Sequence, residues 1–465
     1  MAGVIQIFTK KGSGAPTLTV GGGLGSYRTS KADASISGGI GGFDYAVAMD
    51  KERSHGFNAV SNPASFRYVA DDDGHDGHSV NARLGWQLNA SHRLELSSVY
   101  SKMDAQYDEG TPGVDDHSLS RIQTTRALWS AQWLKEWATK VQLAESVDHY
   151  ELSPSFYETQ TNVRTAAWQN DVQWGSHGLH LTLERREDRL ANATTQYSPQ
   201  FEGERSQNGV AVGYDWRNSA YGLQLNARSD DDSEFGRHDT GALAVGWQWA
   251  DAWRLRASVG TAFRAPTLYQ RFSEYGNANL NPESALNREL GFQFSRSGLT
   301  WDATVFRNQI SNLIGFEAGR YNNISHALLK GVSTSIGVPV GSWQLSGSVD
   351  LQSPTNADTG QLLVRRARQH MSLQVDGPVS GWTLGAQVLV SGRRDDLTFD
   401  ADYNTVRVQL PGYAVLNLTA QRALAPGLSM LVRVDNVADH FYQTAVDYRS
   451  NPRMVFLGLK WTMGH

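Results

Sequence analysis

The chain of 465 residues has 42 Lys and Arg against 47 Asp and Glu, a formal net charge of −5, 45 Gly, 14 Trp and no Cys. Its hydrophobic content is 40% and its mean hydropathy is −0.44, and no window approaches the roughly 18 consecutive apolar residues of a membrane-spanning helix. The net negative charge gives no sign of a basic surface for nucleic-acid binding, and the lack of Cys excludes disulfides and thiolate metal sites. A closed β-barrel with a polar interior is the one membrane-spanning structure compatible with this composition.

From about residue 16 onward, apolar residues alternate with small or polar ones. In residues 242–249, Leu, Val, Trp and Trp alternate with Ala, Ala, Gly and Gln, and the segments 255–263, 428–435 and 455–463 repeat the pattern. A period of two predicts β-strands with one face suited to lipid and the other to a polar interior.

Marking every such segment predicts an all-β protein, a 22-stranded antiparallel transmembrane β-barrel. The strands are expected to begin near residues 16, 29, 43, 78, 92, 119, 139, 161, 179, 205, 220, 237, 252, 286, 299, 325, 342, 361, 381, 412, 427 and 453.

The predicted connections alternate between short turns and long polar loops. Short turns are expected near 39–42, 89–91, 135–138, 175–177, 218–220, 250–252, 295–298, 340–342, 378–381 and 423–427, and long loops at 54–77, 104–117, 188–203, 261–285, 309–322, 392–411 and 437–451. Outer-membrane barrels have tight periplasmic turns and extended extracellular loops, so this alternation assigns the two ends.

Tryptophan placement favours the same assignment. Twelve of the 14 Trp lie within about five residues of a predicted short turn or of the C-terminus, which predicts an aromatic girdle at the periplasmic rim. The alternative, a large soluble β-sandwich or propeller, would scatter Trp through core positions.

Several motifs together resemble the TonB-dependent receptors of Gram-negative outer membranes. Ala2–Gly12 (AGVIQIFTKKG) resembles the last strand of the family's plug domain, and Ala262–Leu268 (AFRAPTL) followed by Gly276–Glu283 (GNANLNPE) resembles its barrel signature. Similar runs occur at Lys330–Val332, Arg365–Ala367 and Val434–Tyr442. The resemblance implies a plug remnant in residues 1–15 and a receptor barrel in residues 16–465.

The start of the chain fits this division. Met1–Ile5 lack the charged stretch and apolar run of a secretory signal. We therefore expect a fragment or a natural start upstream, and coupling to the TonB energy-transducing complex only if an upstream plug and TonB box exist.

Within the family, residues 230–238 and their spacing to Pro282 look most like the cobalamin receptors. The resemblance implies uptake of cobalamin or a related corrinoid across the outer membrane as part of a complete, plugged receptor. Two alternatives stay open, a ferric-siderophore receptor and a plugless, porin-like passive channel. An enzyme is not predicted, because no motif links a nucleophile to a His at the rim.

Cobalamin receptors often bind calcium through Asp-rich loops in the first half of the barrel. The corresponding region here keeps Asp148 and Glu151 without the fuller carboxylate set, and Ca²⁺ takes six to eight oxygen ligands. No cofactor and no metal are therefore predicted, with Asp148 and Glu151 as the weak candidates for calcium.

Aromatic residues in the predicted extracellular loops are candidates for stacking on a flat macrocycle, or equally for packing the loops together. The candidate substrate-binding residues are Tyr157, Tyr197, Tyr269, Tyr275, Asn277 and Tyr321. Arg365, Arg366 and Arg368 are predicted to be lumen-facing charges that contact an anionic ligand or a plug, or that simply line the lumen. The expected partners are outer-membrane lipid and a corrinoid or ferric siderophore.

Overall fold

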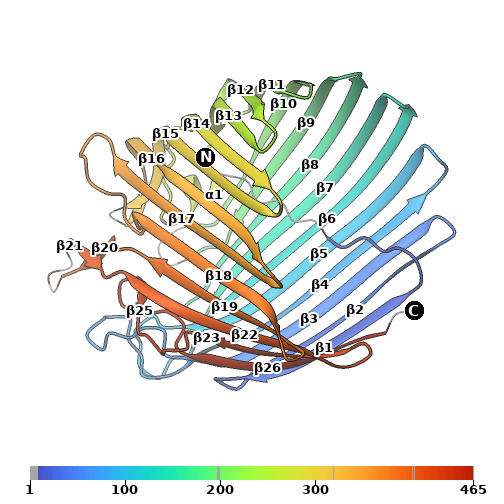
Figure 1. Ribbon diagram of the computed structural model, residues 1–465. Helices are drawn as coiled ribbons and strands as arrows, with labels where there is room; N and C mark the ends of the chain where they lie inside the picture. The colour runs from blue at the N-terminus through green and yellow to red at the C-terminus, as the bar shows by residue number, and fades with distance from the viewer. Residues whose placement is uncertain (1–8, 196–198, 318, 401, 403, 464–465) are drawn as a thin grey trace.

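The computed structural model describes residues 9–195, 199–317, 319–400, 402 and 404–463. It is a closed barrel of 22 antiparallel strands (Figure 1), as predicted. The first and last strands close it: Leu18 pairs with Met463, and the register continues to Gly25 and Phe456.

The barrel strands have the following bounds: β1 (Thr17–Gly25), β2 (Thr29–Ile40), β3 (Phe43–Phe57), β4 (Asp73–Gln87), β5 (His92–Tyr107), β6 (Asp116–Leu134), β7 (Trp137–Ser153), β8 (Tyr157–Trp174), β9 (His177–Asn192), β10 (Phe201–Arg217), β11 (Tyr221–Asp232), β12 (Gly236–Ala250), β13 (Trp253–Arg264), β14 (Glu283–Arg296), β15 (Leu299–Glu317), β16 (Arg320–Val340), β17 (Trp343–Asn356), β18 (Gln369–Val379), β19 (Trp382–Ser391), β22 (Tyr413–Ala425), β23 (Leu428–Asp435) and β26 (Met454–Met463). The loops contain α1 (Leu268–Phe272) and two hairpins, β20 (Arg394–Phe399) with β21 (Thr405–Leu410) and β24 (Gln443–Ala445) with β25 (Tyr448–Arg449). Among the described residues, no helix is long and apolar enough to cross a membrane.

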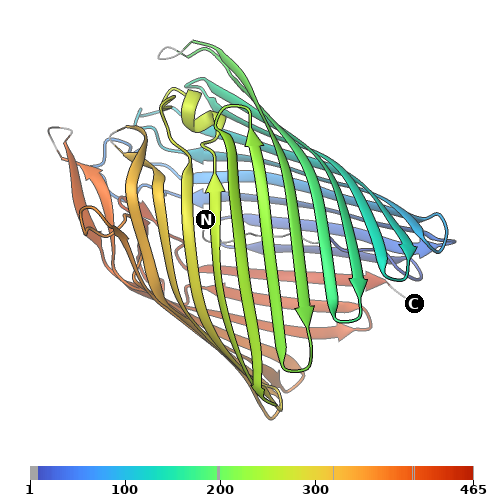
Figure 2. The ribbon, with the colours of Figure 1, turned by 90° about the horizontal axis from the view of Figure 1, so that it is seen from above.

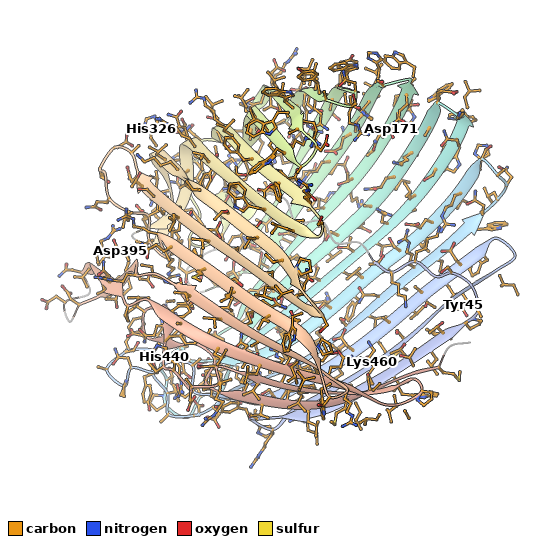
Figure 3. The ribbon with its side chains drawn as sticks, viewed as in Figure 1. Tyr45, Asp171, His326, Asp395, His440 and Lys460 are labelled. Carbon is orange, nitrogen blue, oxygen red and sulfur yellow. The ribbon has the colours of Figure 1, made fainter. Side chains whose placement is uncertain are left out.

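The long loops gather at one end of the barrel and the short turns at the other (Figure 2). Two of the short turns, Ser297–Gly298 and Ser380–Gly381, have positive φ at both central residues. This backbone matches the twist of the flanking strands, which explains why a two-residue hairpin connection suffices there. In Figure 3, Tyr45 and Asp171 lie toward the short-turn end, whereas His326 and Asp395 lie at the long-loop end.

The strands present an apolar face to the outside. Leu457 and Leu459 on β26 are each 49% exposed, and Leu24 on β1 is 71% exposed. Successive side chains on a strand point to opposite faces, so the alternation predicted from the sequence becomes a continuous apolar belt around the barrel.

The inner wall is polar and carries ion pairs between neighbouring strands. The buried Glu95 on β5 accepts hydrogen bonds from Arg83 Nη2 at 2.6 Å and Arg126 Nη2 at 2.8 Å. Arg93 pairs with Asp44 on β3 at 2.7 Å. These contacts join four adjacent strands through side chains as well as through the backbone ladder.

Residues 9–16 lie along this inner wall. Arg83 Nη1 donates to the Thr9 carbonyl oxygen at 3.0 Å, and the Gly39 N–H donates to the Gly14 carbonyl oxygen at 2.8 Å. A Cβ on Gly12 would lie 2.0 Å from the Tyr45 carbonyl oxygen, so only glycine fits there. Residues 1–8 lie outside the described residues, and the assignment of residues 1–15 to a plug stays a prediction.

The Trp residues concentrate at the short-turn end, as predicted. The indole rings of Trp129, Trp133 and Trp137 contact each other in sequence, with centroids 5.9 and 6.2 Å apart. A second group joins Trp247, Trp249, Trp253 and Trp301. Indole prefers the level of lipid headgroups, so these groups form the girdle.

One predicted strand begins eight residues later than expected. The strand placed near residue 361 begins at Gln369, because residues 357–368 form a loop in which Arg365 has φ of +59° and donates its N–H to the Asp395 carbonyl oxygen of β20. Leu363 of this loop packs with Ala285, Ile310 and Ala327, which places the loop over the barrel mouth.

Candidate ligand-binding site

The longest connection that carries candidate residues is the β13–β14 loop, residues 265–282. It contains α1, whose first turn is closed by a capping box: Thr267 Oγ1 accepts from the Gln270 N–H, and Gln270 Oε1 accepts from the Thr267 N–H. The loop presents Tyr269, Tyr275 and Asn277 beside the mouth.

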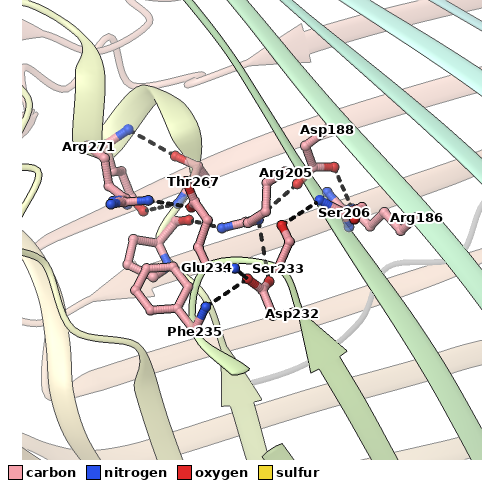
Figure 4. A network of polar contacts seen from close by, with 12 residues as sticks. Arg186, Asp188, Arg205, Ser206, Asp232, Ser233, Glu234, Phe235, Thr267 and Arg271 are labelled. Carbon is pink, nitrogen blue, oxygen red and sulfur yellow. Dashed lines mark hydrogen bonds and ion pairs between the residues drawn. The ribbon is translucent and has the colours of Figure 1, made fainter. Parts of the chain in front are cut away.

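A buried charge network attaches this loop to the barrel wall (Figure 4). The Arg205 guanidinium on β10 donates to the Pro266 carbonyl oxygen at 2.5 Å and to Asp188 Oδ2 at 2.8 Å, and lies 3.4 Å from Asp232 Oδ2. The side chains of Arg205 and Asp188 are 7% and 9% exposed. Strands β9, β10 and β11 therefore hold the start of the loop through one arginine.

The next loop along the rim is attached to the same region. Asp232 Oδ1 accepts the N–H groups of Glu234 and Phe235 in the β11–β12 turn. Arg271 of α1 forms an ion pair with Glu234 and lies over the Phe272 ring. The turn and α1 are thereby fixed relative to each other.

An aromatic cluster forms where the β13–β14 loop meets the β15–β16 hairpin. The Tyr269 and Tyr321 rings lie edge to face at 6.3 Å, Phe316 and Tyr321 at 5.3 Å, and Tyr275 and Phe316 at 5.8 Å. Tyr275 and Phe316 are 46% and 52% exposed, so their rings are available to a ligand. We call these four residues the mouth aromatic cluster.

Only some of the predicted site residues belong to this cluster. Tyr269, Tyr275 and Tyr321 belong to it, and Asn277 supports it by donating from Nδ2 to the Tyr321 carbonyl oxygen at 3.1 Å. Tyr157 is 7% exposed and packs against Tyr150 at 6.4 Å, which leaves little of its ring for a ligand. Tyr197 lies outside the described residues. That any of these residues binds substrate stays a prediction.

Sequence reasoning missed Phe316 and the loop-supporting residues. Phe316 lies in the segment predicted as a long loop, five residues before Tyr321, and the hairpin brings the two into register. Asn323 links the same two loops: its amide accepts the Asn281 N–H at 2.8 Å and donates to the Asn281 carbonyl oxygen at 3.1 Å. The Asn-rich composition of both segments was the available signal.

The surroundings of Tyr275 change the pKa of its phenol. Burial, followed by the neighbouring Glu274, raises the pKa of Tyr275 to about 12. The phenol of Tyr275 is therefore neutral at physiological pH.

The three arginines predicted to face the lumen lie in the loop before β18. Arg365 Nε donates to Asp396 Oδ1 at 2.8 Å, and Asp396 Oδ2 accepts the Val446 N–H at 2.8 Å. Arg365 therefore connects its own loop to the β20–β21 hairpin. The Arg368 carbonyl oxygen accepts the Gln352 N–H at 2.8 Å. A role for Arg365, Arg366 or Arg368 toward an anionic ligand stays a prediction.

The two candidate calcium ligands are separated by the strand geometry. Asp148 and Glu151 are three positions apart on β7, so their side chains point to opposite faces of the sheet. Glu151 Oε2 lies 3.7 Å from His149 Nε2. In the part of the chain that the structure describes, no group of three or more His, Cys, Asp or Glu is placed to hold a metal ion. These residues do not fit a calcium site.

Comparisons with known proteins agree with the architecture. Residues 12–437 match the family described as TonB dependent receptor-like, beta-barrel. The vitamin B12 transporter BtuB of Vibrio cholerae is 29% identical over 99% of this chain and 76% of its own length.

Solved structures of similar fold include siderophore receptors. They include the siderophore receptor PirA of Acinetobacter baumannii (TM-score 0.86, 16% identity, 98% of this chain and 81% of that chain) and a mutant of the ferric enterobactin receptor PfeA of Pseudomonas aeruginosa (TM-score 0.83, 17% identity, 98% and 81%). At these identities the likeness shows the fold alone. The match over residues 12–437 shows the family: this chain belongs to the TonB-dependent receptors, whose β-barrels lie in the outer membrane.

Proposed function

We propose that this chain is the barrel of a receptor that takes up cobalamin or a related corrinoid. The observation that carries the proposal is the 29% identity to a vitamin B12 transporter over 99% of the chain. Energy for import would come from the TonB complex acting on the complete receptor, and no catalytic step is part of the proposal.

The mouth aromatic cluster supports a flat, partly apolar ligand. Tyr275 and Phe316 expose ring faces at the junction of two loops, and aromatic side chains supply large contact areas at low entropic cost. The loops are braced by the Arg205 network and by Asn277, so a ligand meets a largely preformed surface.

A ferric siderophore is the second candidate. The solved structures of similar fold include ferric enterobactin and other siderophore receptors. Their identity to this chain is 17% and 16%, well below that of the vitamin B12 transporter. A passive channel is the third candidate.

The test is equilibrium binding of cyanocobalamin and of ferric enterobactin to the purified protein in detergent. We expect saturable binding of cyanocobalamin that ferric enterobactin does not compete away. The reverse preference would replace the corrinoid by a siderophore, and binding of neither, with free sugar flux through liposomes, would favour the passive channel.

Substitutions in the cluster sharpen this test. Tyr275→Ala combined with Phe316→Ala should weaken cyanocobalamin binding about tenfold or more, because interface aromatics often contribute more than 1 kcal/mol each. The matched control is Tyr221→Ala, an exposed aromatic at the short-turn end, which should leave binding unchanged. Equal binding by all variants would exclude the cluster as the ligand contact.

A further inference from the structure

Three cations lie side by side on the outer face of the barrel. In the sheet register, Arg288 on β14 is directly opposite Arg307 on β15, and Arg307 is directly opposite Lys330 on β16. All three side chains are exposed. They share the outward face with Leu290, Val305 and Val332, which lie one step nearer the short turns.

These cations stand at the level where the strands leave the membrane. Arg307 is the ninth residue of β15, and Arg288 is the ninth residue of β14 counted from its short turn; Lys330 is the eleventh of β16 counted the same way. A strand crosses a bilayer in about 9–11 residues. Beyond Arg307 the outward residues of β15 are Gln309 and Ser311, so this strand becomes polar there, whereas Leu286 and Leu328 lie opposite Gln309 on the neighbouring strands.

A groove runs between the cationic row and the apolar row. It has a volume of about 610 Å³, and its lining includes Arg307, Lys330 and Ser353 along one side and Val305, Val332 and Leu351 along the other. Its floor is backbone at Gly331 and its neighbours across the sheet. The groove therefore offers an edge for an anion and, immediately below it, a wall for hydrocarbon.

No carboxylate neutralises the three cations. Among the described residues, none of the three forms an ion pair, and Arg288 donates only to the neutral Gln309 Oε1, at 3.0 Å. The outward positions of β14–β18 from the short turns up to this level contain no Asp or Glu. Asp358, in the loop above, is engaged by His326 at 2.9 Å.

Several outward cations elsewhere on the barrel are paired. Arg164 contacts Glu145 at 2.8 Å, Arg185 contacts Glu187 at 2.9 Å, and Arg237 contacts Asp239 at 3.1 Å. Like charges directly opposite each other on neighbouring strands destabilise a sheet. An external anion would relieve this repulsion in the unpaired row at β14–β16.

We propose that the Arg288–Arg307–Lys330 row binds the phosphorylated sugar headgroup of an outer-leaflet glycolipid, with an acyl chain in the groove below. The phosphate would accept charge-assisted hydrogen bonds from the guanidinium and ammonium groups. The hydrocarbon would cover Val305, Val332 and Leu351. The site depends on the outer-membrane location and not on which ligand the receptor imports.

Native mass spectrometry of the purified protein, titrated with bisphosphorylated lipid A in detergent, tests the proposal. We expect the wild type to retain lipid. Arg307→Gln/Lys330→Gln should bind lipid about 30-fold more weakly, because each cation contributes roughly five- to sixfold to the affinity. The matched control Arg185→Gln/Arg237→Gln should bind lipid as the wild type does. The charge-preserving exchange Arg307→Lys/Lys330→Arg should bind within a few-fold of the wild type.

Two further arms identify the source of the anion. Lipid A stripped of both phosphates should not be retained, and inorganic pyrophosphate in 100-fold excess should displace little bound lipid because it lacks acyl chains. Equal binding of the dephosphorylated lipid, displacement by pyrophosphate alone, or undiminished binding by the Gln variant would each overturn the proposal. If the Gln variant does not fold, the salt dependence of lipid binding by the wild type is measured between 0.1 and 1 M salt. Binding that weakens with salt supports the proposal, since screening weakens contacts between exposed charges, and binding that does not change overturns it.

Discussion

Arg205 connects strands β9, β10 and β11 to the β13–β14 loop at the mouth. It contacts Asp188 on β9, Asp232 on β11 and the Pro266 carbonyl oxygen in the β13–β14 loop. Removal of one partner from a group of buried charges destabilises the group, because the remaining charges stay buried with fewer contacts to compensate them.

Replacement of Arg205 by Ala should therefore free the β13–β14 loop. The loss should be about 1–3 kcal/mol in local stability, because Asp188 keeps its ion pair with Arg186 and Asp232 keeps the N–H groups of Glu234 and Phe235. Hydrogen exchange of residues 265–282 measures the effect, with the barrel strands as internal reference. Arg237→Ala, which removes an exposed pair with Asp239, should leave the exchange of the loop almost unchanged, because exposed ion pairs contribute little to stability; equal protection in both variants would contradict the anchoring role.

The site was only partly predictable at this scale. Tyr269, Tyr275 and Tyr321 were identified because aromatic residues in loops are recognisable from the sequence alone. Arg205 was missed because it lies on a strand whose polar face carries other charges, and its partner Pro266 is 61 positions away. Phe316 was missed because its contact with Tyr321 depends on the hairpin register.

At the scale of elements, alternation predicted the strands best where one face meets lipid. β2, β3, β5 and β15 begin at the predicted residues 29, 43, 92 and 299. β4 and β16 begin five residues earlier than predicted, at Asp73 and Arg320, because both faces are polar where a strand extends beyond the membrane and the alternation is lost. α1 carries a capping-box sequence, Thr267 with Gln270, but five residues are too few for a helical period.

The irregular segment of residues 9–16 depends on Gly12 for its place on the inner wall. Gly12→Ala would place a Cβ 2.0 Å from the Tyr45 carbonyl oxygen and 2.4 Å from that of Gly38, and both are backbone atoms that cannot rotate away. We expect the segment to leave the inner wall and residues 9–16 to become sensitive to protease. Ser13→Ala, at an exposed position, is the control; resistance of the Gly12 variant equal to that of the control would show that the wall yields instead.

At the scale of the whole molecule, closure depends on the pairing of β1 with β26. Leu24 and Leu457 are direct partners across this seam. The chain has no Cys, so Leu24→Cys/Leu457→Cys introduces a single disulfide across it. We expect efficient oxidation and a cross-linked product with altered migration on a denaturing gel. Leu24→Cys/Leu459→Cys is two residues out of register and should oxidise poorly; equal yields from both variants would argue against the register.

The same seam has a kinetic consequence. Thr19 and Thr462 hydroxyls lie 3.3 Å apart although 443 positions separate them along the chain. Bringing such distant segments together costs about 5 kcal/mol of loop-closure entropy, and pairing of remote strands is slow compared with the formation of neighbouring hairpins. Until that step is complete, β1 and β26 are open sheet edges that can add strands from other molecules. The last pairing is therefore also the step that ends the chain's exposure to aggregation.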